Sequence, residues 1–176
     1  REVVPVRTLV ISLLVTFALS SPLLSDVTVQ DTVYLSSPEN ARAPWGIDTD
    51  LETGRVYVAG LEYPYRLAVL DPPSNQVIYN IQLSGLYPHG VCVYGDARRA
   101  FVANTGSANI SVVDLNLLRE VTTLPAGSSP VDLCLNFTTR LLYVANEYSN
   151  NVMVYDADSL NIVDTIAVGA GPYSIC

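Results

Sequence analysis

The stretch that decides the fold begins at Pro130, where Pro130-Val-Asp-Leu-Cys134 is followed by Tyr143-Val-Ala-Asn146, Tyr155-Asp156 and Ile166-Ala-Val-Gly169. At Pro172 the pattern begins again, so one unit is 42 residues long. A repeat of about this period that consists of strand-like runs is typical of a β-propeller, in which each repeat forms one blade. The sequence therefore predicts an all-β fold of four-stranded antiparallel blades.

Two earlier copies of the unit open at Pro44 and Pro88. In each copy an aromatic residue follows the opening proline by 13 positions, and these residues are Tyr57, Phe101 and Tyr143. An aspartate that closes an apolar run also recurs, as Asp71, Asp114 and Asp156. Its recurrence predicts a structural role, the bonding of turn amides. The copies divide the chain into blades at 44–87, 88–129 and 130–171, and the first strand of a further blade at 172–176.

Within a copy, four runs of β-branched and aromatic residues alternate with turn residues. In the third copy we expect strands near 131–136, 140–145, 151–156 and 161–168. The second run is almost wholly apolar, as in Leu141-Leu-Tyr-Val-Ala145. Such a strand is covered on both faces, which a blade between two neighbours would provide.

Tyr143-Val-Ala-Asn146, with Ser149-Asn-Asn-Val152, Ile162–Gly169 and Pro172, resembles the YVTN-family β-propeller repeat, and the similarity extends from Pro44 to Cys176. The resemblance implies the propeller fold and a setting among exported or surface-associated proteins, with lactonase-like and quinoprotein-associated propellers as relatives. It brings no catalytic motif. The first copy departs from the pattern at Gly60, where the other copies have asparagine.

Three blades are too few to close a propeller, which needs roughly four to eight. We expect an incomplete ring in this chain and the remaining blades in a longer chain. Val27–Leu35 resembles the last strand of a blade, so 21–43 is interpreted as a linker plus the outer strand of an incomplete blade.

Composition excludes several partners. The formal net charge is −8 and hydrophobic residues make up 49% of the chain. This acidity disfavours binding to nucleic acid or to anionic lipid. All nine basic residues are arginine, which excludes Schiff-base chemistry on lysine and the P-loop.

Residues 1–20 have the layout of a secretory signal peptide. Arg1 and Arg7 precede an apolar run from Leu9 to Leu19, which is too short for a membrane span, and small residues precede a predicted cleavage site after Ser20. An uncleaved signal anchor and a buried strand are the alternative interpretations. The prediction is a secreted, periplasmic or cell-surface protein with no membrane contact beyond this segment. Export would also give meaning to the sequons at Asn109 and Asn136.

Cys92, Cys134 and Cys176 each lie four positions after a repeat proline. They are interpreted as small apolar residues of the inner strand, with a thiolate cluster that includes His89 as the alternative. Asp48, Asp50 and Glu52 have the spacing of a calcium loop but lack its glycine and terminal glutamate. We therefore predict no metal, no cofactor and no catalytic residue, since the only histidine has no triad pattern around it.

Aromatic residues concentrate in the loops that strand alternation places on one face of the disc. They are Trp45, Tyr63, Tyr65, Tyr87, His89, Tyr148 and Tyr173. Such rings offer a large contact area and a polar group, which suits binding to a protein or a carbohydrate. The alternative is that they only pack over the blade ends.

The sequence thus favours a noncatalytic binding or interaction module outside the cell. Two alternatives remain open: an enzyme or enzyme subunit of the lactonase-like or quinoprotein-associated type, and a structural component of a surface layer.

Overall fold

The computed structural model describes residues 43–176. The predicted signal peptide, its cleavage site and the strand at Val27–Leu35 lie outside the described residues. Nothing in the described part of the chain is a helix of the length and apolarity that crossing a bilayer requires.

The described residues form three four-stranded antiparallel sheets, and each sheet is one of the predicted blades. Blade 1 comprises β1 (Pro44–Thr49), β2 (Val56–Gly60), β3 (Arg66–Asp71) and β4 (Gln76–Gln82). Blade 2 comprises β5 (Pro88–Tyr94), β6 (Arg99–Asn104), β7 (Asn109–Asp114) and β8 (Arg119–Pro125). Blade 3 comprises β9 (Pro130–Asn136), β10 (Leu141–Asn146), β11 (Asn151–Asp156) and β12 (Ile162–Ala167). The four strands expected in the third copy are confirmed, with boundaries shifted by one residue.

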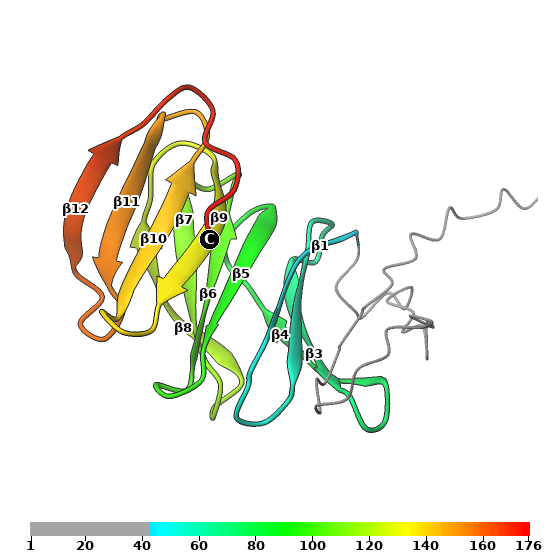
Figure 1. The fold of residues 1–176 in the computed structure, drawn as a ribbon. Helices are drawn as coiled ribbons and strands as arrows, with labels where there is room; N and C mark the ends of the chain where they lie inside the picture. Colours follow the sequence, from blue (N-terminus) through cyan, green and yellow to red (C-terminus); the bar gives the residue numbers. More distant parts are fainter. Residues whose placement is uncertain (1–42) are drawn as a thin grey trace, which may run out of the picture.

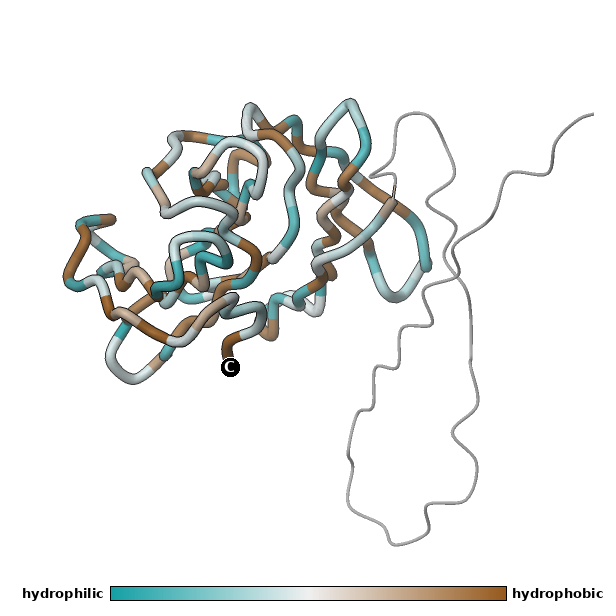
Figure 2. Tube along the Cα trace, turned by 90° about the horizontal axis from the view of Figure 1, so that it is seen from above, coloured by the Kyte–Doolittle hydropathy of each residue, from teal (hydrophilic) through white to brown (hydrophobic). Residues whose placement is uncertain are grey.

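In each blade the strands follow one another in chain order, so the first strand is an edge of its sheet. These first strands lie next to one another: β1 packs beside β5, and β5 beside β9 (Figure 1). Seen from above, the chain follows an arc around an open centre, and the C-terminal residues return toward it (Figure 2). The molecule is an incomplete β-propeller, and β1, β5 and β9 line its central channel.

Alternating side chains of each blade point toward opposite neighbours, because successive residues of a strand face opposite sides of the sheet. Val91 and Val93 of β5 therefore pack against Tyr57 and Ala59 of blade 1. On the other side of blade 2, a second cluster with Phe101 packs against blade 3. Two hydrophobic cores thus lie between blades, and the middle blade contributes to both.

One face of blade 3 is open. Leu124 of blade 2 is 8% exposed against blade 3, whereas Ile166, its counterpart one repeat later, is 42% exposed. The predicted cover on both faces of the second strand therefore holds for β6 of the middle blade, which is buried from Ala100 to Asn104. It does not hold for β10, whose Leu141 and Tyr143 are only half-buried, because no described blade covers them.

The recurring aspartates bond turn amides, as predicted. The Oδ1 atom of Asp114 accepts from the backbone amides of Asn116 and Leu117, both at 2.8 Å. Asp71 and Asp156 hold their own turns in the same way. The role of this repeat position is structural.

The asparagine that ends the Tyr-Val-Ala-Asn run joins neighbouring loops. Asn146 is fully buried, its Oδ1 accepts from the amide of Gly127 at 3.1 Å, and its Nδ2 donates to Asn151 at 2.9 Å. The Nδ2 atom of Asn104 donates to Asn109 and to Ser111, both at 2.8 Å, and only its bond to Asn109 has a counterpart at Asn146. This run therefore lies inside a blade and shapes the loop before the next proline, and it presents no ligand-binding group.

Candidate functional site

Three of the predicted rim residues meet at the mouth of the channel, where the inner strands begin. The ring centroids of Trp45 and His89 are 4.7 Å apart with the planes tilted by 43°. His89 meets Tyr173 edge to face at 5.8 Å. Trp45 is 54% exposed and Tyr173 is 51% exposed. We call these three residues the central aromatic cluster; they come from blade 1, blade 2 and the segment after β12.

Close approach of the inner strands brings these rings together. A Cβ atom at Gly90 would lie 2.8 Å from the carbonyl oxygen of Val131. At Gly46 a Cβ atom would collide with the carbonyl group of His89. In blade 3 the residue after the repeat proline is Val131, which is buried and has no ring. The next residue at this repeat position is Tyr173, and its ring contacts His89. Glycine next to the rings is therefore part of how the cluster is built.

The hydrogen bonds of His89 define its tautomer. Its Nδ1 lies 2.7 Å from the carbonyl oxygen of Val131, which can only accept, so Nδ1 carries the proton. The Nε2 atom is then the acceptor for the Tyr173 hydroxyl at 3.4 Å. Burial lowers the pKa of His89 below its usual 6.5, against smaller upward effects of the Val131 bond and the carboxylates of Asp132 and Glu147. His89 is thus a neutral, oriented ring at pH 7.

A second group lies over the ends of blades 1 and 2. Tyr63 meets Tyr65 edge to face with centroids 5.9 Å apart, and Tyr65 meets Tyr87 at 5.5 Å. Tyr63 is 77% exposed. We call these three residues the tyrosine cluster. The six residues of the two clusters were all on the predicted rim.

Tyr87 adopts a backbone conformation that bulky residues avoid, with φ at 54°. The residue before the repeat proline has a positive φ in every copy, but elsewhere it is small: Ala43, Ser129 and Gly171. Gly106 leaves the room that the Tyr87 ring needs. The ring of Tyr87 is thus carried by a backbone conformation that the other copies give to small residues.

Tyr148, the seventh predicted residue, is 73% exposed and makes no ring contact with either cluster. It occupies in blade 3 the position of Gly106 in blade 2. In turn, Ser129 of blade 3 occupies the position of Tyr87 in blade 2. Each blade therefore has one tyrosine and one small residue at these two positions, in opposite order.

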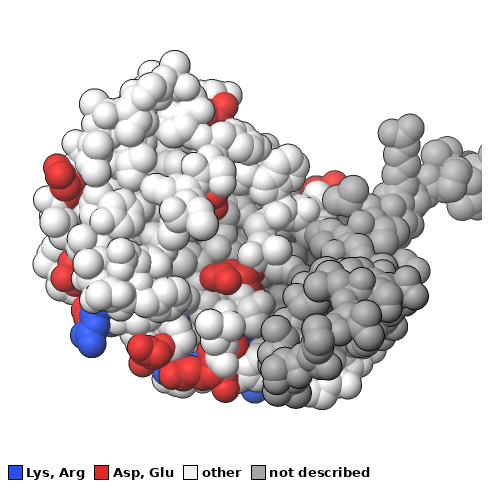
Figure 3. All heavy atoms as spheres, in the orientation of Figure 1, with Lys and Arg blue, Asp and Glu red and all other residues white. Residues whose placement is uncertain are grey.

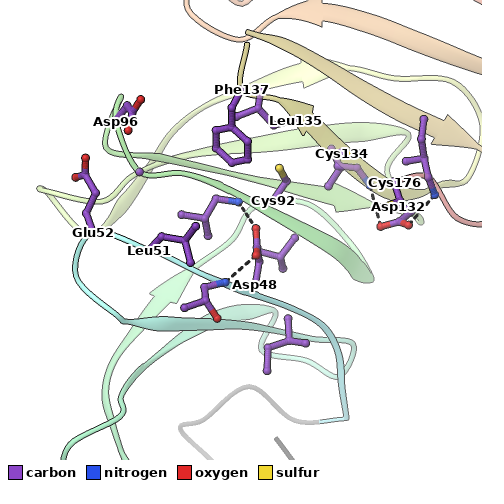
Figure 4. A pocket seen from close by; sticks show the side chains of 17 residues that line it. Asp48, Leu51, Glu52, Cys92, Asp96, Asp132, Cys134, Leu135, Phe137 and Cys176 are labelled. Carbon is purple, nitrogen blue, oxygen red and sulfur yellow. Dashed lines mark hydrogen bonds between the residues drawn. The ribbon is translucent and has the colours of Figure 1, made fainter. Parts of the chain in front are cut away.

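Farther down the channel lies a cavity of about 520 Å³ (Figure 4). Its wall includes the residues that lie four positions after each repeat proline, which are Asp48, Cys92, Cys134 and Cys176. Leu51 and Phe137 lie near its other end and are 88% and 60% exposed. Asp48 is the equivalent of the cysteines in blade 1, an unpredicted relation that its offset of four from Pro44 could have indicated. Phe137, an exposed ring on the opposite face, was not predicted either.

The repeat position of Asp48 and Cys92 connects neighbouring inner strands. The carboxylate of Asp48 accepts from the amide of Val93 at 2.6 Å and of Thr49 at 2.7 Å. The Cys92 thiol has the same relation to the amide of Leu135. Burial raises the pKa of Cys92 to about 12, so this thiol stays protonated at neutral pH.

The burial of Cys92 fits the apolar interpretation of this repeat position. Cys92 is buried, Cys134 half-buried and Cys176 exposed, and all three are free thiols. Within residues 43–176 no group of three or more His, Cys, Asp or Glu side chains is arranged to hold a metal ion. The three acids with calcium-like spacing also have other partners. Asp50 binds Arg98 and Thr53, Glu52 lies 3.9 Å from Arg98, and Asp48 accepts from strand amides.

Charge is distributed unevenly between the two ends of the channel. In Figure 3 the arginine atoms lie along the lower edge, where the turns between first and second strands are, and acidic atoms occur at both ends. The loops of the aromatic rim follow the second and fourth strands, and they therefore lie at the end of the blades where the β10 arrow ends (Figure 1).

No protein-family model and no curated protein matches the chain. Solved structures do match. Hydrazine synthase from Kuenenia stuttgartiensis has a TM-score of 0.69 and 20% identity over 76% of this chain and 38% of that chain. Apo AztD from Citrobacter koseri has a TM-score of 0.61 and 16% identity over 73% of this chain and 36% of that one. A further structure of Citrobacter koseri AztD has a TM-score of 0.59. At these identities the similarity shows the fold alone: the protein is of the β-propeller class, and it spans less than two fifths of the chains that it matches.

Proposed function

We propose that this chain is a noncatalytic β-propeller module of the YVTN-repeat type that binds a protein or carbohydrate partner on its aromatic rim. The observation that carries the proposal is the contact between Trp45, His89 and Tyr173, whose outer rings remain half exposed. Rings that only sealed the blade ends would be buried, as Phe101 is.

The proposed place of action is outside the cytoplasm, in the periplasm or at the cell surface. Support comes from the signal-like layout of residues 1–20. The open face of blade 3, with Ile166 42% exposed, supports the packing of a further blade there.

The binding proposal is tested with the Trp45→Ala/Tyr173→Ala double variant on peptide and glycan arrays. We expect wild-type protein to retain a defined set of ligands, and the double variant to lose them with an unchanged melting temperature. Tyr148→Ala is the matched control, because it removes an exposed ring outside both clusters. A double variant that binds as wild type does, or that unfolds, would refute the proposal in favour of simple packing.

A further inference from the structure

The surroundings of the central aromatic cluster are negative. The charged side chains that act on the pKa of His89 are the carboxylates of Asp132 and Glu147. On the face that Figure 3 shows, the visible arginine atoms lie at the opposite end of the channel, whereas Arg66 lies at the rim end, where β3 begins. The chain has no lysine, and its net charge is −8. Among the described residues, the charges that act on this cluster are therefore carboxylates, which favour the approach of a cation over that of an anion.

The rings themselves suit a cation. Trp45 provides the aromatic face on which cations bind best, and it is 54% exposed. Tyr173 meets His89 edge to face with centroids 5.8 Å apart, so His89 contacts both of the exposed rings. His89 is neutral at pH 7 and donates its Nδ1 proton to Val131, which leaves no positive charge within the cluster to repel a ligand.

The two carboxylates differ in their roles. Asp132 is occupied by the fold: its Oδ2 accepts from the Ser174 hydroxyl at 2.9 Å and from the Ile175 amide at 3.0 Å. It thereby fixes the segment that carries Tyr173. Glu147 accepts one bond from the Ser129 hydroxyl at 3.1 Å and is partly exposed. Glu147 is therefore the carboxylate that can face a ligand.

From this geometry we infer that the central aromatic cluster binds the guanidinium or ammonium group of a basic peptide segment, stacked on Trp45 and balanced by Glu147. This inference rests on the proposed binding function and narrows its ligand class. A neutral sugar would use the same rings but would gain nothing from the carboxylates.

Trp45 is the only tryptophan of the chain, so its fluorescence reports on the cluster directly. The full chain is titrated with N-acetylarginine N-methylamide and, separately, with the citrulline derivative, which has nearly the same shape and no charge. We expect the arginine compound to bind about tenfold more tightly, in the range of cation–π contacts. Glu147→Gln should weaken arginine binding about threefold and Tyr173→Ala about fivefold, and 0.5 M salt should weaken it further.

Glu52→Gln is the control for charge, since it removes a carboxylate at the opposite end of the channel. Equal binding of the arginine and citrulline compounds, or an arginine response that Glu147→Gln leaves unchanged, would overturn the inference. A Trp45 response to methyl α-glucoside but not to arginine would overturn it too, while leaving the proposed binding function in place. Absence of any change in Trp45 fluorescence would overturn the cation site. The peptide and glycan arrays would then test the proposed binding function separately.

Discussion

One missing side chain at Gly90 determines how closely two inner strands approach. The carbonyl oxygen of Val131 lies 2.8 Å from the position that a Cβ atom would take, and the same oxygen accepts the hydrogen bond of His89. The geometry of the central aromatic cluster therefore depends on a residue that has no functional group. Neither this nor the lateral bond of Asp48 could be predicted from the sequence, because both depend on the distance between blades. The rim residues themselves were predictable, since strand alternation alone places their loops at one end.

Gly90→Ala should lower the free energy of unfolding by about 1 to 3 kcal/mol, because the added methyl group forces the backbones of β5 and β9 apart. Chemical denaturation monitored by circular dichroism measures this. Gly169→Ala is the matched control, because nothing lies within 4 Å of its Cβ position. Similar stabilities for the two variants would contradict the close approach.

His89 predicts a pH dependence. Burial lowers its pKa in the folded state, so above pH 6.5 the residue is neutral in both states and contributes no slope. As the pH falls through 6.5 the unfolded chain takes up the proton first, and stability is lost until the lower folded pKa is reached. His89→Gln should therefore lose less stability than wild type between pH 7.5 and 5.5. Because Asp48, Asp132 and Glu147 remain in both proteins, urea unfolding at the two pH values isolates His89. Parallel losses would show that its pKa is not lowered.

The three free thiols should react in the order of their exposure. Ellman's reagent at pH 8 should label Cys176 rapidly, Cys134 more slowly and Cys92 only after unfolding, because Cys92 is buried and its pKa is raised to about 12. Mass spectrometry of the labelled peptides measures the order. Early labelling of Cys92 would mean that the inner strands of blades 2 and 3 do not pack as described.

At the scale of the element, the repeat made the blades predictable. The repeat proline, the aromatic residue and the aspartate recur in every copy. The strands predicted in one copy therefore give the positions of the strands in the others. The repeat pattern does not show which face of a blade is covered by an adjacent blade. Phe101 and Tyr143 occupy one repeat position, yet Phe101 is fully buried and Tyr143 only half-buried, because blade 3 covers the first of them.

Leu124→Ala should destabilise the protein by about 2 to 4 kcal/mol, because Leu124 is 8% exposed in the core between blades 2 and 3. Ile166→Ala changes the equivalent residue of blade 3, which is 42% exposed, and should cost under about 1 kcal/mol in this chain. Thermal unfolding of both variants measures the difference. Equal costs would mean that another surface covers Ile166 in solution.

At the scale of the whole molecule, the fold class followed from the sequence, while ligand and location did not. The residues that recur in all copies specify the propeller fold. The residues that differ between the copies specify the aromatic rim. Trp45, His89, Val131 and Tyr173 hold one repeat position with four different side chains, so no repeat pattern predicts that three of them meet.

The lateral bonds of the inner strands also have a mechanical consequence. Blades 1 and 2 are joined at the channel through Asp48 and Val93, and blades 2 and 3 through Cys92 and Leu135. A force that pulls on the ends of the chain must break these contacts one interface at a time. Under a force probe the protein should therefore lengthen in discrete steps, and each released blade of 42 or 44 residues should add about 140 to 160 Å of extended chain.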